Sequence, residues 1–158
     1  MAGIVIGRFW DTRTESARWR RDQKTTSYQR YAEQFQALYE ATRLAAFADS
    51  RTDTFAALVE HARSSTFPVW VNALSAVWLH GSSEVVTAAM QLDQAVTDLF
   101  YGVADRTVSE LNWDTARTPA RDAFQRFIVS ARTELGLPLV DVAFFTEPRS
   151  QARTTDAD

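Results

Sequence analysis

The 158-residue sequence predicts an all-α fold: an antiparallel bundle of four to five helices with a long N-terminal helix and an extended C-terminal segment. Apolar residues recur at spacings of three and four along most of the chain, which is the period of an amphipathic helix. Serine, threonine, proline and glycine punctuate these stretches where helices begin and end. The chain has 46% apolar residues and no cysteine, so its core must be stabilised by packing, and disulfide, zinc-thiolate and thiol-nucleophile classes are excluded.

The first predicted helix carries the stripe Tyr28, Tyr31, Phe35, Leu38, Thr42 and Ala45. No proline or glycine interrupts the chain between Arg8 and Asp49, so we expect this helix to run back through the N-terminal residues. The sequence therefore divides into a basic, aromatic helical arm (1–27), a helical bundle (28–146) and a flexible polar tail (147–158).

Thr52 and Asp53 are predicted N-caps of a second helix, and the polar run 64–66 is expected to break it. Pro68 suits the first turn of a third helix, which is expected to end at Gly81. The predicted inward face of that helix consists of Trp70, Leu74, Val77 and Trp78.

Ser82 or Ser83 is the predicted N-cap of a fourth helix, followed by a loop over 105–118 that contains one helical turn. The core face of this helix is the most regular in the chain: Val85, Ala89, Leu92, Val96, Leu99 and Val103.

The last predicted helix has Thr118 as its N-cap and Pro119 at its first position, and Gly136 and Pro138 end it. The apolar, β-branched run 139–145 is expected to dock on the bundle as an extended segment, because no second strand is evident.

Few residues point to catalysis. The two histidines, His61 and His80, stand in no zinc or di-iron motif, and the chain has no P-loop, dinucleotide-binding or nucleophile-elbow pattern. We therefore predict no catalytic residue, metal or cofactor. An enzyme or small-ligand binder with a pocket between helices stays open as an alternative, with His80 or Trp113 at its rim or facing a partner.

The arm is the distinctive region of the sequence. Residues 8–24 hold six basic and three acidic side chains, a net charge of +3, whereas the whole chain has a net charge of −3. On a helix four of the basic side chains share one face with Trp10 and Ala17, and that face continues the apolar stripe that begins at Tyr28. These four are Arg13, Arg20, Arg21 and Lys24. The candidate interaction residues of the arm are Trp10, Arg13, Trp19, Arg20, Arg21 and Lys24.

Three interpretations of the arm follow: a solvated or self-associating helix, a segment near an anionic membrane surface, and a nucleic-acid-binding element. The leading hypothesis is a non-enzymatic interaction domain that acts through self-association or with a membrane-adjacent protein partner. Nucleic-acid binding ranks last because the arm also carries three acidic residues and the chain is acidic overall.

Three stretches resemble a group of small actinobacterial helical-bundle proteins with an Arg/Trp-rich, juxtamembrane-like N-terminal helix and no established activity. The stretches are the Arg-Trp-Arg-Arg-Asp run at 18–22, the helix junction at 79–85 and the closing helix at 127–136. The resemblance implies a bacterial protein of the cytoplasm, with the inner face of the membrane as the alternative location. In those proteins the apolar N-terminal segment is long enough for a membrane anchor, whereas here it has about six residues. The expectation is that the anchor is lost or lies upstream of this sequence.

Overall fold

The computed structural model describes residues 3–138, and within them the side chains of residue 15 and of residues 18–138. Its helices, in chain order, are α1 (Gly3–Ala46), α2 (Asp53–His61), α3 (Phe67–His80), α4 (Ser83–Ala104), α5 (Trp113–Ala116) and α6 (Thr118–Glu134). The part of the chain that the structure describes contains helices and no strand, so the predicted all-α bundle is confirmed. The predicted extended segment 139–145 and the polar tail lie outside the described residues.

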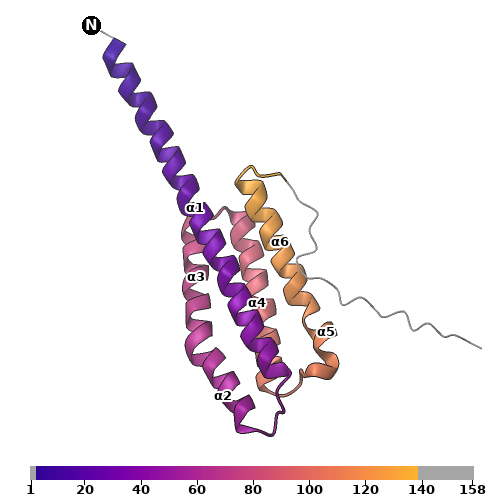
Figure 1. Cartoon of the computed structure of the whole chain (residues 1–158). Coiled ribbons are helices and arrows are strands. Elements are labelled where there is room, and N and C mark those ends of the chain that lie inside the picture. The colour runs from indigo at the N-terminus through magenta and orange to yellow at the C-terminus, as the bar shows by residue number, and fades with distance from the viewer. Residues whose placement is uncertain (1–2, 139–158) are drawn as a thin grey trace, which may run out of the picture.

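Helix α1 is one uninterrupted helix of 44 residues, as the absence of internal proline predicts. Its C-terminal half packs along the bundle, and its N-terminal half projects beyond the other helices (Figure 1). The predicted stripe is the buried face: Tyr31, Phe35, Leu38 and Thr42 have no measurable exposure.

Helices α2 and α3 are not separated by the predicted break. Residues Ala62–Thr66 form a π-helical turn that joins the two helices. The Ser64 hydroxyl donates a hydrogen bond to the Glu60 carbonyl, four residues back. The serine therefore bonds to the backbone of the preceding turn and does not end the helix. The wider turn changes the rotation of the helix, so that Phe55 of α2 and Trp70 of α3 both reach the core.

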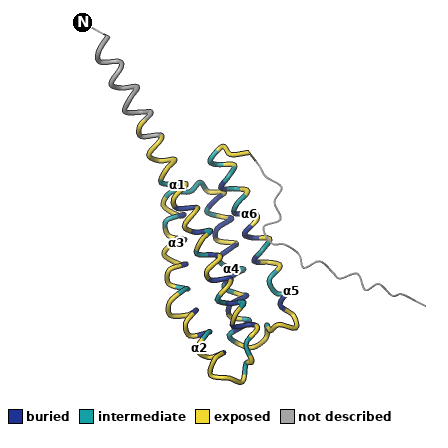
Figure 2. Tube along the Cα trace, viewed as in Figure 1, coloured by how far each residue is buried: buried dark blue, intermediate teal, exposed yellow. Residues whose placement is uncertain are grey.

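The core is built around aromatic rings from three helices. Tyr31 stacks on Trp70 with 4.1 Å between ring centroids, and Phe35 stacks on Phe124 at 4.3 Å. Phe127 meets Tyr31 edge to face at 5.0 Å. Dark blue segments in Figure 2 show that buried residues of the packed helices face one another along the bundle axis.

The helix ends follow the predicted punctuation in part. The side chains of Thr52 and Ser82 accept hydrogen bonds from backbone N–H groups three residues later, so both predicted N-caps are confirmed. Gly136 has a φ of +64° directly after α6, as expected for a helix C-cap. Thr118 is not an N-cap, because the turn of α5 leads directly into α6 and the Thr118 hydroxyl donates to the Asp114 carbonyl.

Trp78 also departs from the sequence-based expectation. Helical spacing predicts an inward-facing side chain, yet the side chain of Trp78 is 55% exposed. The buried face of α3 is narrower than predicted and consists of Trp70, Ala73, Leu74 and Val77.

Candidate functional site

The projecting part of α1 (residues 3–27) forms the described part of the N-terminal arm. Its described side chains are solvent-exposed up to Asp22, and Trp19 is 62% exposed. Burial begins at Ser27 and Tyr28, where α1 reaches the other helices (Figure 2). The arm therefore depends on contacts at its base for its direction.

A polar cluster centred on Glu134, the last residue of α6, holds the base of the arm. The Lys24 ammonium group pairs with one carboxylate oxygen of Glu134, and the Tyr28 hydroxyl donates to the other. The backbone N–H of Ser82 also donates to that second oxygen, at 3.3 Å. One carboxylate thus joins α1, the start of α4 and the end of α6.

The environment of Glu134 keeps it ionised. Burial opposes the charge, but the hydrogen bonds from Lys24, Tyr28 and Ser82 outweigh it and hold the pKa of the Glu134 carboxyl below its ordinary value. Burial, followed by the hydrogen bond to the Glu134 carboxylate and its charge, raises the pKa of the Tyr28 hydroxyl. At neutral pH the cluster therefore consists of an anion that accepts from a cation, a neutral phenol and a backbone amide.

Two further contacts fix the arm at its base. A guanidinium nitrogen of Arg21 donates to the Leu135 carbonyl at 2.8 Å, at the C-terminal end of α6, where carbonyl groups lack helical partners. On another side of α1, Ser27 Oγ lies 2.7 Å from His80 Nδ1. The Ser27 hydroxyl proton goes to the Gln23 carbonyl, so its oxygen is left to accept from a protonated Nδ1. His80 thereby acts as a fixed contact between α3 and α1.

The structure brings only part of the predicted interaction set together. Arg21 and Lys24 contact α6, and Arg20, although exposed, lines the same hollow at the base of the arm as they do. Trp19 lies on the exposed surface of α1. Trp10 and Arg13 lie within the helix, and their side chains fall outside the described residues. These two sites are therefore placed by helical register alone.

The expectation that Trp113 faces a ligand or partner is corrected. Its side chain is 3% exposed and packs against the rings of Tyr39 and Phe47. The polar neighbours in sequence, Asn112 and Asp114, are both exposed, and a helical turn directs the indole between them into the core.

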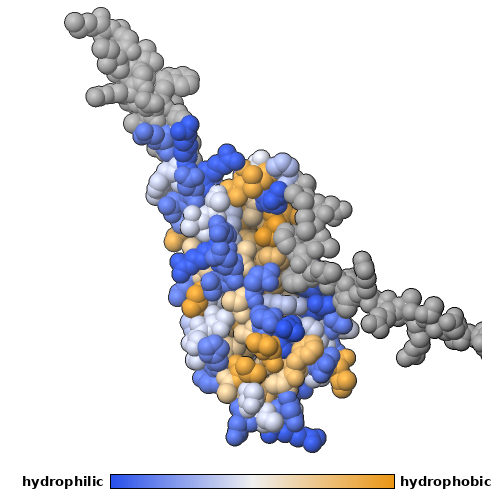
Figure 3. Space-filling model, in the orientation of Figure 1, coloured by the Kyte–Doolittle hydropathy of each residue, from blue (hydrophilic) through white to orange (hydrophobic). Residues whose placement is uncertain are grey.

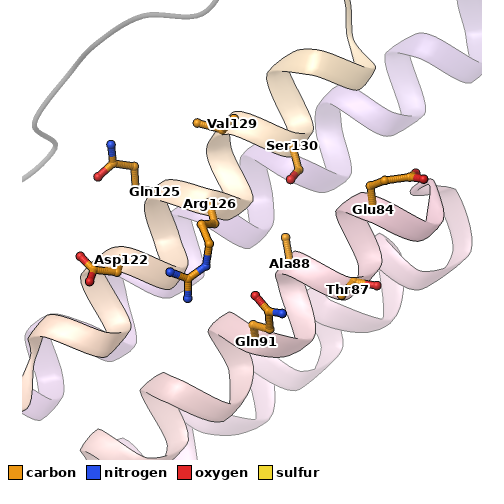
Figure 4. Close-up of a pocket in the computed structure, with 9 residues that line it drawn as sticks. All are labelled: Glu84, Thr87, Ala88, Gln91, Asp122, Gln125, Arg126, Val129 and Ser130. Atoms are coloured by element: carbon orange, nitrogen blue, oxygen red, sulfur yellow. The ribbon is translucent and has the colours of Figure 1, made fainter.

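The described surface is hollowed at the base of the arm and between α4 and α6. A hollow of about 430 Å³ at the base of the arm is lined by Arg20, Arg21, Lys24, Glu134, Leu135 and Gly136. An open groove of about 540 Å³ runs between α4 and α6. It is lined by Glu84, Thr87, Ala88, Gln91, Asp122, Gln125, Arg126, Val129 and Ser130 (Figure 4).

The α4/α6 groove lacks the arrangement of a catalytic pair. Figure 4 places its two carboxylates, Glu84 and Asp122, at opposite ends, with Arg126 and Gln91 projecting into the space between the helices. Backbone and Ser82 and Ser83 hydrogen bonds lower the pKa of Glu84, which fits a role at the N-terminus of α4. Neither His80 nor Trp113 lines this groove.

Sequence reasoning missed the Glu134 cluster. Lys24 and Glu134 are 110 residues apart, and each is unremarkable within its own helix. The only available signal was a carboxylate in the last turn of a helix, where the dipole disfavours negative charge unless a cation is close.

Comparison with protein-family models, with curated proteins and with solved structures found no match to this chain. No helix among the described residues combines the length and apolar character needed to cross a bilayer. The function is therefore argued from the arm, its base and the surface of the bundle.

Proposed function

We propose that this protein is a non-enzymatic interaction module, in which the bundle is a rigid base and the N-terminal arm binds a protein, either a second copy or a membrane-adjacent partner. The observation that carries the proposal is the arm itself: a helix that continues past the bundle and is fixed in direction by Lys24, Tyr28 and Glu134. Residues 3–27 would extend about 36 Å as an α-helix.

Helix energetics support a binding role. In proteins most helical stability comes from the burial of one helix face against other elements. An arm that packs on a partner gains the burial that its own bundle does not supply. The contacts at its base orient that face before binding, which lowers the entropic cost of association.

Charge supports a protein partner over a nucleic acid. Of the basic side chains at 8–24, Arg21 and Lys24 already contact α6. The segment also carries Asp11, Glu15 and Asp22, which would repel a phosphate backbone. A protein surface with both apolar and acidic groups suits this composition better.

Site-specific photo-crosslinking tests the proposal. A photoreactive amino acid replaces Arg13 of the full chain in its native host cells, and adducts are identified by mass. We expect one discrete adduct, with a second copy or with one other protein. The matched control carries the same group at Gln125, an exposed position of the α4/α6 groove, and is expected to give none. Absence of an adduct at position 13, or an equally strong one at position 125, would contradict the proposal.

A further inference from the structure

Helix α3 has an apolar side that α4 contacts at Phe67 and that is otherwise largely exposed. Between Phe67 and His80 it contains no lysine, arginine, aspartate or glutamate. Val71 and Trp78 are about half exposed, and Phe67, Val71 and Trp78 share one side of the helix by their spacing of four and seven. A helix that is apolar on its outer side as well as its inner side is typical of an element that packs on two neighbours.

Helix α4 extends this surface. Met90 is 50% exposed and Tyr101 is 48% exposed. The ring of Tyr101 lies 6.4 Å from the ring of Phe67, which places the two helices' apolar residues side by side at one end of the surface. We call this surface the apolar strip; it consists of Phe67, Val71, Trp78, Met90 and Tyr101.

The two helices that form the apolar strip contain no lysine or arginine. Helix α4 contains Asp93, Asp98 and Glu84, of which Glu84 lines the α4/α6 groove. Asp93 lies on the α3 side of α4, where its carboxylate accepts a hydrogen bond of 2.7 Å from the indole of Trp70. A partner for this surface therefore needs an apolar face with basic side chains.

The arm of this same chain has such a face. The core stripe of α1 continues N-terminally from Tyr28 at spacings of three and four, and it then passes through Arg20, Ala17, Arg13 and Trp10. Continuous helix over Gly3–Ala46 keeps these positions on one side. Trp19 falls on the opposite side of the helix by the same period.

We infer that the partner of the arm is a second copy of this chain, and that the arm face with Trp10 and Arg13 packs on the apolar strip of that copy. The arm cannot reach the strip of its own bundle, because α1 is continuous and leads away from it (Figure 1). A two-fold axis near the base of the arms would give two equivalent contacts, which is the commonest arrangement of homodimers.

The lengths and charges of the two surfaces agree. The strip from Phe67 to Trp78 spans about 17 Å of helix, and the arm from Gly3 to Arg20 spans about 26 Å. The acidic side chains of α4 complement the basic arm and would repel an anionic lipid surface, which favours a second copy over a membrane. This inference rests on the proposed function and specifies its partner.

Sedimentation of the full chain between 1 and about 200 μM, with paired variants, tests the inference. The arm variant is Trp10→Ser with Arg13→Glu, and the strip variant is Trp78→Ser with Met90→Ser. We expect each to weaken dimerisation at least about tenfold. The matched controls are Asp22→Ser, an exposed position on the other side of the arm, and Leu111→Ser, a 99% exposed position outside the strip, and both should dimerise like the wild type.

Mixing the arm variant with the strip variant distinguishes an arm–strip contact from an arm–arm or a strip–strip contact. The intact arm of the strip variant can bind the intact strip of the arm variant, so the mixture should associate more strongly than either variant alone. If arms bound arms, or strips bound strips, mixing would restore nothing. Circular dichroism spectra that match the wild type establish that both variants fold.

Cysteine cross-linking tests whether the arm of one copy contacts the apolar strip of another, in chains that keep the native residues of both surfaces at the positions changed above. The sequence contains no cysteine, so thiols introduced as Ala17→Cys in one copy and Ser75→Cys in another are the only ones present. We expect the mixed disulfide to form faster than either homodimeric disulfide. Predominance of the Ala17→Cys homodimer would overturn the inference.

The outcomes separate the inference from the proposed function. A wild-type chain that stays monomeric, or a strip variant that dimerises normally, overturns the assignment of the second copy and its strip. An arm adduct with a different protein would then still support the proposed function. If the photoreactive group at position 13 also gave no adduct, both the inference and the proposed function would be contradicted.

Discussion

At the scale of single residues, Glu134 does the most to connect separate parts of the chain. Its carboxylate accepts from Lys24 and Tyr28 of α1 and from the backbone of Ser82, and its side chain is 13% exposed. Because these donors favour the ionised form, folding stabilises the carboxylate and lowers its pKa. The same group therefore links the stability of the bundle to the direction of the arm.

We predict that Glu134→Gln lowers the free energy of unfolding by about 1–2 kcal/mol at pH 7. Since the folded-state pKa lies below the ordinary value of 4.5, the stabilisation by the charged form is present above that pH and is lost as the pH falls through the folded-state pKa. Urea unfolding at several pH values should show the gap between wild type and variant closing below about pH 4.5.

The matched control for this experiment is Asp122→Asn, which neutralises an exposed carboxylate on the same helix. Its unfolding free energy should stay within about 0.5 kcal/mol of the wild type. A gap for Glu134→Gln that is independent of pH would contradict the role assigned to its charge.

The aromatic core provides a second prediction. Phe35 is fully buried and stacks on Phe124, so Phe35→Ala should lower the unfolding free energy by about 3–5 kcal/mol through lost burial and a new cavity. Leu111→Ala removes a side chain that is almost fully exposed and should change stability little. Chemical denaturation of the two variants measures the contrast, and similar losses would show that the core is assigned wrongly.

At the scale of elements, turns and helix ends decide which faces meet. The π-helical turn Ala62–Thr66 sets the rotation of α3 relative to α2. The close approach of α4 to the loop after it depends on Gly102, where an added Cβ would lie 2.8 Å from the Val108 side chain. These local features place whole helices, so their effects extend beyond the residues involved.

Gly136 offers a test at this scale. Its φ of +64° disfavours any side chain, although an added Cβ would contact nothing within 4 Å. Gly136→Ala should therefore cost about 1 kcal/mol of stability through backbone strain alone. Gly136→Asn should cost less, because asparagine adopts this conformation more readily. Thermal unfolding of both variants checks the order, and an alanine variant as stable as the wild type would refute it.

At the scale of the whole molecule, charge and apolar surface are unevenly distributed. On the face seen in Figure 3, hydrophilic side chains cover the described part of the arm, and apolar side chains gather at both ends of the bundle. Residues 8–24 have a net charge of +3, and the rest of the chain has −6. This separation favours contacts between the arm of one molecule and the body of another.

The proposed dimer should therefore weaken with salt. Raising NaCl from 50 to 500 mM shortens the Debye length and should lower the association constant by roughly threefold to tenfold. Sedimentation equilibrium at the two salt concentrations measures the change. An association that strengthens with salt would indicate a contact held by apolar burial without charge complementarity.

The sequence predicted the helices well because helix formation leaves local signs. The stripe of α1 from Tyr31 to Thr42, the caps at Thr52 and Ser82 and the left-handed Gly136 all follow from spacing or backbone preference. The basic face of the arm was likewise visible, since helical period alone groups its side chains.

Only the tertiary structure decided which apolar faces are buried and which charges meet. The sequence predicts a buried Trp78 and an exposed Trp113, and the structure shows the reverse, because a helical period does not say which neighbours cover a face. Lys24 and Glu134 meet across 110 residues of sequence, a distance over which no local pattern operates. The sequence by itself determined the helices and the basic arm, whereas packing of separate helices fixed the base of the arm and left the apolar strip exposed.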